Sequence, residues 1–161
     1  QFNYEFVAWK PERVVAFVAN KGGIYYSALV SQDARKVPGI LFIGGKDLES
    51  RIDMITGLFQ LNRRGGALWA LAEEPGVGHV VGRSMDVAKV LFEDALAARL
   101  GDDKYSLKAI SEKDGFIGDA KAKTFQAAAT AGNQTVSNPW FLTERIAKAW
   151  KAMVSETPFE P

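Results

Sequence analysis

The sequence predicts an α/β protein in which a partial parallel sheet is flanked by helices. Three short apolar runs have the length and β-branched composition of buried strands. Stretches with apolar residues at helical spacing lie between and after these runs. Strands that alternate with helices over short connections pair in parallel through right-handed crossovers.

The chain opens with a predicted helix. Phe2, Phe6 and Trp9 recur at i, i+4 and i+7, the spacing of one helical face, and Pro11 ends the run. Neither a capping residue nor an initiator methionine precedes this helix. We therefore expect it to be the remainder of a longer helix, in a chain that was processed or cut from a larger polypeptide.

Three buried strands are predicted next. They are residues 13–20 (RVVAFVAN), 38–45 (PGILFIGG) and 67–74 (ALWALAEE), apolar runs that glycine, proline or charged residues bound. Residues 24–37 are mixed and predict a loop with a short helical turn. Because parallel strands are normally covered by neighbours, a sheet of these strands alone should need a further segment at its edge.

Two amphipathic helices follow the second and third strands. Residues 49–66 carry a capping box of Ser50 and Asp53 and end at a pair of glycines. A second helix runs from Ser84, which is a good N-cap residue, to Gly101. Both helices are expected to cover the sheet.

The chain is expected to form one portion of a single domain, with a core (residues 1–100) and an extension (residues 101–161). Residues 102–138 are polar and alanine-rich without a clear period, and predict a surface excursion with some helix. Asn138 and Pro139 predict the cap and first residue of a last helix. The apolar face of that helix comprises Leu142, Ile146, Ala149, Trp150 and Met153.

Composition excludes several classes of protein. Among 161 residues, 47% are hydrophobic and 24% charged; the net charge is +1, which argues against a nucleic-acid or polybasic membrane surface. No apolar stretch approaches the roughly 18 residues of a membrane span. The absence of cysteine excludes disulfides and thiolate chemistry, and a single histidine leaves little for a metal site. We expect no cofactor and no metal, and the compartment stays open.

The candidate site lies beyond the carboxyl ends of the second and third strands, where functional groups gather in an open parallel sheet. Asp47 follows the second strand, and His79, the only histidine, lies in the loop after the third. If these strands are neighbours, the carboxylate can hold one imidazole nitrogen and leave the other free as a base. Asp47 and His79 would then be two-thirds of a catalytic triad.

The candidate residues also have explanations that involve no catalysis. Asp47 can be a helix cap or a first-turn charge, and His79 an ordinary loop residue. Glu73 and Glu74 are interpreted as rim charges, and Ser84 as the cap of its helix. The aromatic residues that could line a pocket, but that more often pack in a core, are Tyr25, Tyr26 and Trp69.

The succession PERVVAFVANKGG, VPGILFIGGKDLESR and GGALWALAEEPGVGH, followed by a helix, resembles the C-terminal half of the α/β-hydrolase fold. More narrowly, it is similar to bacterial serine esterases of the carboxylesterase and depolymerase-like type. The resemblance covers roughly residues 1–100. It implies that Asp47 is the acid and His79 the base of a Ser-His-Asp triad, and that an N-terminal half, as a separate chain or a cleaved segment, completes the sheet.

The chain departs from this family because it carries neither the G-x-S-x-G nucleophile elbow nor an HGGG-like oxyanion loop. Around Ser84, GRSMD has Asp86 where glycine is required, and it follows the histidine although the family order is serine, acid, histidine. In the family a helix follows the elbow, so the resemblance implies that the serine lies a few residues upstream of Gln1.

The resemblance thus implies a carboxylic ester hydrolase that is active only when completed by its N-terminal half. Its substrate would be a small-molecule or polymeric ester, and a secreted or periplasmic bacterial protein is favoured. One alternative is a non-catalytic α/β binding or interaction module in which Asp47 and His79 are incidental. Another is a different α/β enzyme that uses the same layers, because a fold does not determine the chemistry.

Overall fold

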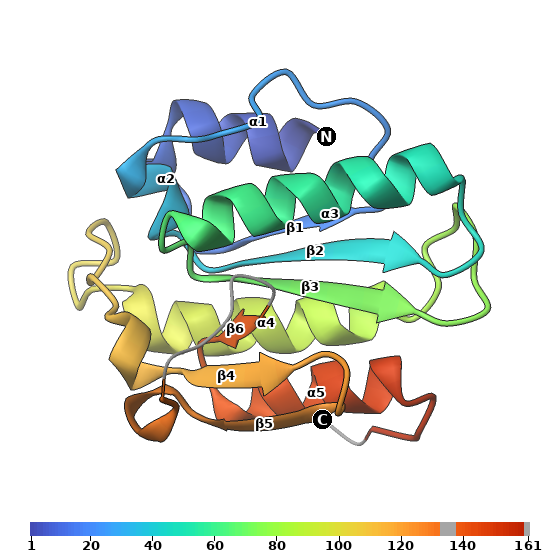
Figure 1. Cartoon of the computed structure of the whole chain (residues 1–161). Coiled ribbons are helices and arrows are strands. Elements are labelled where there is room, and N and C mark those ends of the chain that lie inside the picture. Colours follow the sequence, from blue (N-terminus) through green and yellow to red (C-terminus); the bar gives the residue numbers. More distant parts are fainter. Residues whose placement is uncertain (133–137, 160–161) are drawn as a thin grey trace.

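The structure is a computed structural model that describes residues 1–132 and 138–159. The strands β1, β2 and β3 form one parallel sheet in that order, and their arrows point the same way in Figure 1. The predicted α/β class and the parallel sheet are confirmed. The elements of this part of the chain are α1 (Phe2–Trp9), the 3₁₀ helix η1 (Pro11–Arg13), β1 (Phe17–Asn20), α2 (Gln32–Arg35), β2 (Gly39–Gly44), α3 (Glu49–Arg64), β3 (Trp69–Glu74) and α4 (Ser84–Arg99).

The C-terminal part adds a small antiparallel sheet in the order β5-β4-β6, below β3 in Figure 1. Residues 102–138 were expected to be a surface excursion with some helix. Within its described part the helix is limited to 3₁₀ turns, and the main elements are strands that the sequence did not predict. The elements are η2 (Glu112–Asp114), β4 (Phe116–Asp119), β5 (Thr124–Ala127), η3 (Ala128–Thr130), β6 (Trp140–Phe141) and α5 (Glu144–Val154).

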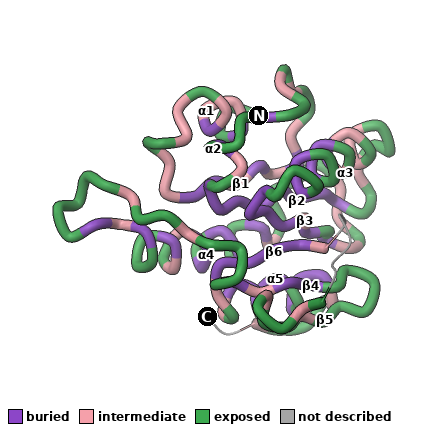
Figure 2. Tube along the Cα trace, turned by 60° about the vertical axis from the view of Figure 1, so that its left-hand side comes forward, coloured by how far each residue is buried: buried purple, intermediate pink, exposed green. Residues whose placement is uncertain are grey.

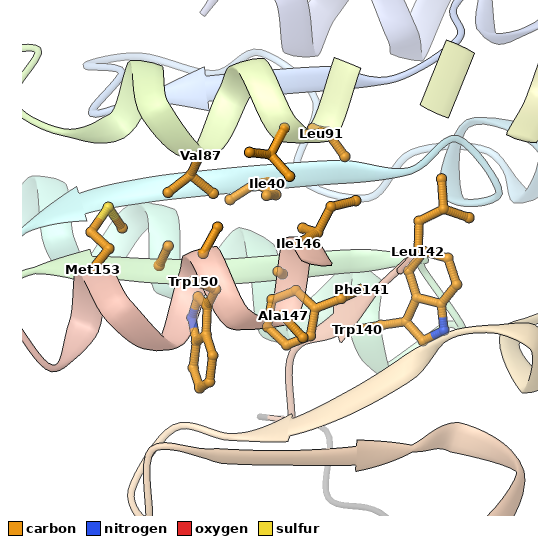
Figure 3. Packing of buried hydrophobic residues seen from close by; sticks show 14 of the residues in the cluster. Ile40, Val87, Leu91, Trp140, Phe141, Leu142, Ile146, Ala147, Trp150 and Met153 are labelled. Atoms are coloured by element: carbon orange, nitrogen blue, oxygen red, sulfur yellow. The ribbon is translucent and has the colours of Figure 1, made fainter. Parts of the chain in front are cut away.

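The parallel sheet is buried on both faces by two apolar clusters. In β2, Ile40 and Phe42 belong to the cluster shared with α4 and α5, whereas Leu41 and Ile43 belong to the cluster under α1, α2 and α3. Figure 3 shows side chains from α4 and α5 gathered around Ile40, and Figure 2 shows the strands as the most buried part of the trace. Burial on both faces explains why these strands have nearly continuous apolar sequences.

Helix α1 forms where it was predicted, and the face that enters the core is not the aromatic face from which the helix was predicted. The side chains that enter the core are Tyr4 and Val7. Phe2 and Trp9 are 76% and 70% exposed; Phe6 stacks on Phe2 and meets Trp9 edge-on. Both sides of this helix carry apolar residues, so the residues that the helix packs against determine which side is buried. Tyr4 packs edge-on against two aromatic rings of the core, Phe17 and Trp69, and its side of the helix is therefore the buried one.

The predicted starts of two long helices need correction. Helix α3 takes Leu48 as its N-cap without a side-chain cap, so the expected capping box of Ser50 and Asp53 is wrong. In α4 the N-cap is Arg83, and Ser84 is the first helical residue. The hydroxyl of Ser84 donates to the carbonyl of Val81 at 2.6 Å instead of accepting from the helix.

The last helix starts later than predicted. Thr143 is the N-cap of α5, and its hydroxyl accepts from the amide of Ile146 at 3.2 Å. The Asn138–Pro139 pair instead enters β6, where the carbonyl of Pro139 accepts from the amide of Gly118 at 2.8 Å. The predicted apolar positions are all buried, although Leu142 precedes the helix; within α5 they are Ile146, Ala149, Trp150 and Met153.

The described residues themselves cover part of both sheet edges. At β3, the indole of Trp150 donates to the carbonyl of Leu71 at 3.0 Å. Near β1, the side-chain amide of Asn3 donates to the carbonyl of Val18 at 3.0 Å, and Arg99 donates to the carbonyl of Val14 at 2.9 Å. These contacts satisfy main-chain groups that an open edge would expose. The further segment expected from the sequence stays a prediction.

Candidate functional site

The loops after β2 and β3 leave the same end of the sheet and are joined by main-chain hydrogen bonds (Figure 1). The amide of Gly45 donates to the carbonyl of Glu74, and the amide of Lys46 to that of Val77, each at 2.9 Å. A Cβ on Gly44 would lie 2.5 Å from the carbonyl oxygens of Val77 and Gly78, so a glycine permits this close approach. The two loops are therefore held as one unit.

Asp47 and His79 meet across these loops, as the sequence predicts for neighbouring strands. Nδ1 of His79 lies 3.3 Å from Oδ2 of Asp47. The Asp47 side chain is 3% exposed, whereas that of His79 is 56% exposed. A buried carboxylate thus holds an imidazole that faces solvent.

The second oxygen of Asp47 is held by its own helix. Oδ1 accepts from the amide of Leu48 at 2.8 Å and from the guanidinium of Arg51. Burial by itself would raise the pKa of Asp47, but the hydrogen bonds from Leu48, Arg51 and His79 outweigh it and lower this pKa below its usual value. The carboxylate is therefore ionised at neutral pH and fixed in orientation.

This arrangement determines what the imidazole can do. When Nδ1 carries the proton and donates it to Asp47, Nε2 is left with its lone pair. Among the hydrogen bonds of the described residues, none reaches Nε2 of His79. At 3.3 Å the contact is slightly longer than a usual N–H···O hydrogen bond. The pair can accept a proton at Nε2 and stabilise the resulting imidazolium.

Sequence reasoning missed Arg51. Its guanidinium pairs with Asp47 at i, i+4 and adds a positive charge beside the carboxylate. The signal was present in the sequence, because an acidic residue four positions before an arginine at a helix start favours such a pair.

Other candidate residues take separate places. Glu73 is exposed, as expected of a rim charge. The same interpretation of Glu74 is wrong, because Glu74 is 4% exposed and pairs with Lys21. Ser84 is buried, which excludes it as an accessible nucleophile. Of the three aromatic candidates, Trp69 is in the core, Tyr25 packs edge-on against Tyr4, and Tyr26 is exposed.

Exposed apolar residues occur near the pair in the sequence. Four exposed apolar side chains lie next to Asp47 or within a few residues of His79 in sequence: Leu48, Val80, Val81 and Met85. Within residues 1–132 and 138–159, there is no cluster of three or more histidine, aspartate or glutamate side chains suited to a metal ion. No helix in the same ranges has the length and apolar character to cross a membrane.

No protein-family model, curated protein or solved structure matches this chain. The resemblance of the sequence to the α/β-hydrolase fold therefore stays a prediction, and the chemistry has to be argued from the geometry of Asp47 and His79.

Proposed function

We propose that this chain supplies the acid and the base of a serine-type carboxylic ester hydrolase. Asp47 is the acid and His79 the base, and the nucleophilic serine comes from an N-terminal half, as a separate chain or a cleaved segment. The observation that carries the proposal is the contact of 3.3 Å between Oδ2 of Asp47 and Nδ1 of His79 at adjacent strand ends.

In the proposed reaction, Nε2 of His79 takes the serine proton while the serine oxygen attacks the ester carbonyl carbon. The imidazolium then returns this proton to the leaving alcohol, and an acyl-enzyme remains. Water attacks the acyl-enzyme with His79 again as base, which releases the carboxylic acid and restores the serine. Asp47 holds the ring and stabilises its positive charge throughout.

Burial and exposure support this assignment. A base must reach a substrate, and the imidazole is largely exposed; an orienting acid must be fixed, and Asp47 is buried with both oxygens bound. The lowered pKa of Asp47 keeps the carboxylate charged, so it favours the imidazolium that forms during proton transfer.

A non-catalytic binding module is the second candidate. The hydrogen bonds of Asp47 to Leu48 and Arg51 favour it, because they fix the start of α3 without any reaction. In that case the exposed apolar side chains that lie near His79 in sequence would contact a partner.

A fluorophosphonate probe, which labels activated serines, separates the two candidates. Chain 1–161 alone should not be labelled, whereas the protein completed by the proposed upstream segment should be labelled at a serine there. His79→Ala should abolish this labelling, while Lys46→Ala, a change to an exposed residue of the same loop, should leave it unchanged. Absence of labelling in the completed protein would favour the binding module.

A further inference from the structure

A buried ion pair lies beneath the loop that carries His79. Lys21 follows β1 and is 1% exposed; Glu74 ends β3 and is 4% exposed. The ammonium of Lys21 donates to Oε2 of Glu74 at 3.0 Å. Charged side chains are almost never so deeply buried unless they are paired. The hydrogen bonds and ion pairs of Lys21 and Glu74 do not include Asp47 or His79. The proposed chemistry therefore leaves this pair unexplained.

Both members of the pair also bind the main chain of the His79 loop. The Lys21 ammonium donates to the carbonyl of Val81 at 3.3 Å, and its third partner is the side chain of Asn20 at 3.3 Å. The other oxygen of Glu74 accepts from the amide of Arg83 at 2.7 Å. The pair thus holds the loop at two main-chain groups that come shortly after His79.

The backbone on each side is shaped for these contacts. Lys21 has a φ of 50°, a conformation that residues other than glycine rarely adopt. Gly82, between the two bound loop residues, has a φ of 56°, and a Cβ there would lie 2.2 Å from Oε2 of Glu74. The unfavourable conformation of Lys21 persists where the surrounding contacts fix it, whereas glycine adopts the conformation of residue 82 without strain.

We propose that Lys21 and Glu74 are positioning residues that hold the loop of residues 75–83 and thereby keep His79 in contact with Asp47. Their role in catalysis rests on the proposed function, whereas their role in fixing the loop does not. An apolar pair of similar volume can stabilise a core equally well, but it cannot bind a carbonyl and an amide of the loop. The hydrogen bonds to Val81 and Arg83 are what the ion pair contributes.

Three variants of chain 1–161 test this inference. Lys21→Met removes the ammonium, and Glu74→Gln removes the negative charge at constant shape. Gly82→Ala places a Cβ against the Glu74 carboxylate, in a backbone conformation that also strains an alanine. The matched control is Arg63→Met, which removes another buried cation, one that binds the carbonyl of Ala67 just before β3, at the opposite end of that strand. This control reports what a general loss of stability does to the loop.

Two NMR measurements follow the loop. The exchange rates are compared under conditions in which the proteins have equal global stability. Hydrogen exchange at the amide of Arg83 should then be at least about tenfold faster in the three variants than in wild type. In the control, it should stay within about threefold of the wild-type rate. The ring signals of His79, the only histidine, should shift in the variants towards those of Asp47→Asn and stay unchanged in the control.

The inference is overturned if a folded variant keeps wild-type exchange at Arg83 and wild-type ring signals. It is also overturned if none of the three folds, because the pair would then hold the whole domain instead of the loop. In the completed hydrolase, Lys21→Met should lower kcat with little change in KM. Should the wild-type protein have no hydrolase activity, the proposed function fails, while the NMR result still decides the positioning role.

Discussion

Two carboxylates lie at the same end of the sheet in different surroundings. Asp47 binds an exposed imidazole and an arginine near the surface, whereas Glu74 binds a buried lysine and the main chain of a loop. The first arrangement leaves a ring nitrogen of the imidazole accessible, and in the second both partners are buried. The carboxylate whose partner is exposed can therefore take part in a reaction, whereas the carboxylate whose partner is buried fixes the conformation of a loop.

The largest expected effect is on the buried pair. Lys21→Met leaves the Glu74 carboxylate buried without its cation, so the free energy of unfolding should fall by about 3–5 kcal/mol in urea titrations. The control is Lys36→Met, which removes an exposed ion pair with Asp33 and should change it by less than about 1 kcal/mol. Equal effects for the two lysines would show that burial does not distinguish them.

The next effect tests whether the two loops form one unit. Gly44→Ala places a Cβ against the carbonyl oxygens of Val77 and Gly78, and should cost about 1–3 kcal/mol in unfolding free energy. Gly57→Ala, in α3 with open space around it, should be neutral or stabilising by up to about 1 kcal/mol. If Gly44→Ala is also neutral, the loops do not depend on this close approach.

The pH dependence of stability tests Asp47. Because its pKa is lowered on folding, Asp47 stabilises the protein above the unfolded value near 4, and this contribution is lost as pH falls through the folded pKa. Asp47→Asn should lower the unfolding free energy by about 1–2 kcal/mol at pH 7 and by much less near pH 2. Urea titrations at both pH values measure this difference, and a pH-independent difference would contradict the assigned shift.

The smallest expected effect belongs to His79. Its side chain is more than half exposed, so His79→Ala should change the unfolding free energy by less than about 0.5 kcal/mol. Thermal unfolding of the variant checks this prediction. A large loss of stability would show that His79 has a structural role. The contrast between His79 and the buried Glu74 would then disappear.

The sheet and the Asp47–His79 pair were predictable because both depend on local patterns. Continuous apolar runs predict buried parallel strands, and residues just beyond adjacent strand ends meet. The pair was found because β2 and β3 are neighbours, which is the condition on which the sequence prediction depended. Arg51 could have been found from its spacing to Asp47.

The parts that were missed depend on distant contacts. Lys21 is buried by a partner 53 residues away, and an isolated lysine predicts only exposure. Strand β5 is largely exposed and shows no strong alternation, so only its pairing with β4 identifies it. In α1 both sides carry apolar residues, and the core rings opposite Tyr4 decide which side is buried.

The central claim is that Asp47 orients and supports His79 as a base for a serine supplied from outside this chain. The most direct test is steady-state ester hydrolysis by the completed protein, comparing wild type with Asp47→Asn and with Lys46→Ala. The account predicts that Asp47→Asn lowers kcat by about 10³–10⁴-fold while Lys46→Ala leaves it unchanged. Hydrolysis by Asp47→Asn within about threefold of wild type would contradict it, since the carboxylate would then have no part in the reaction.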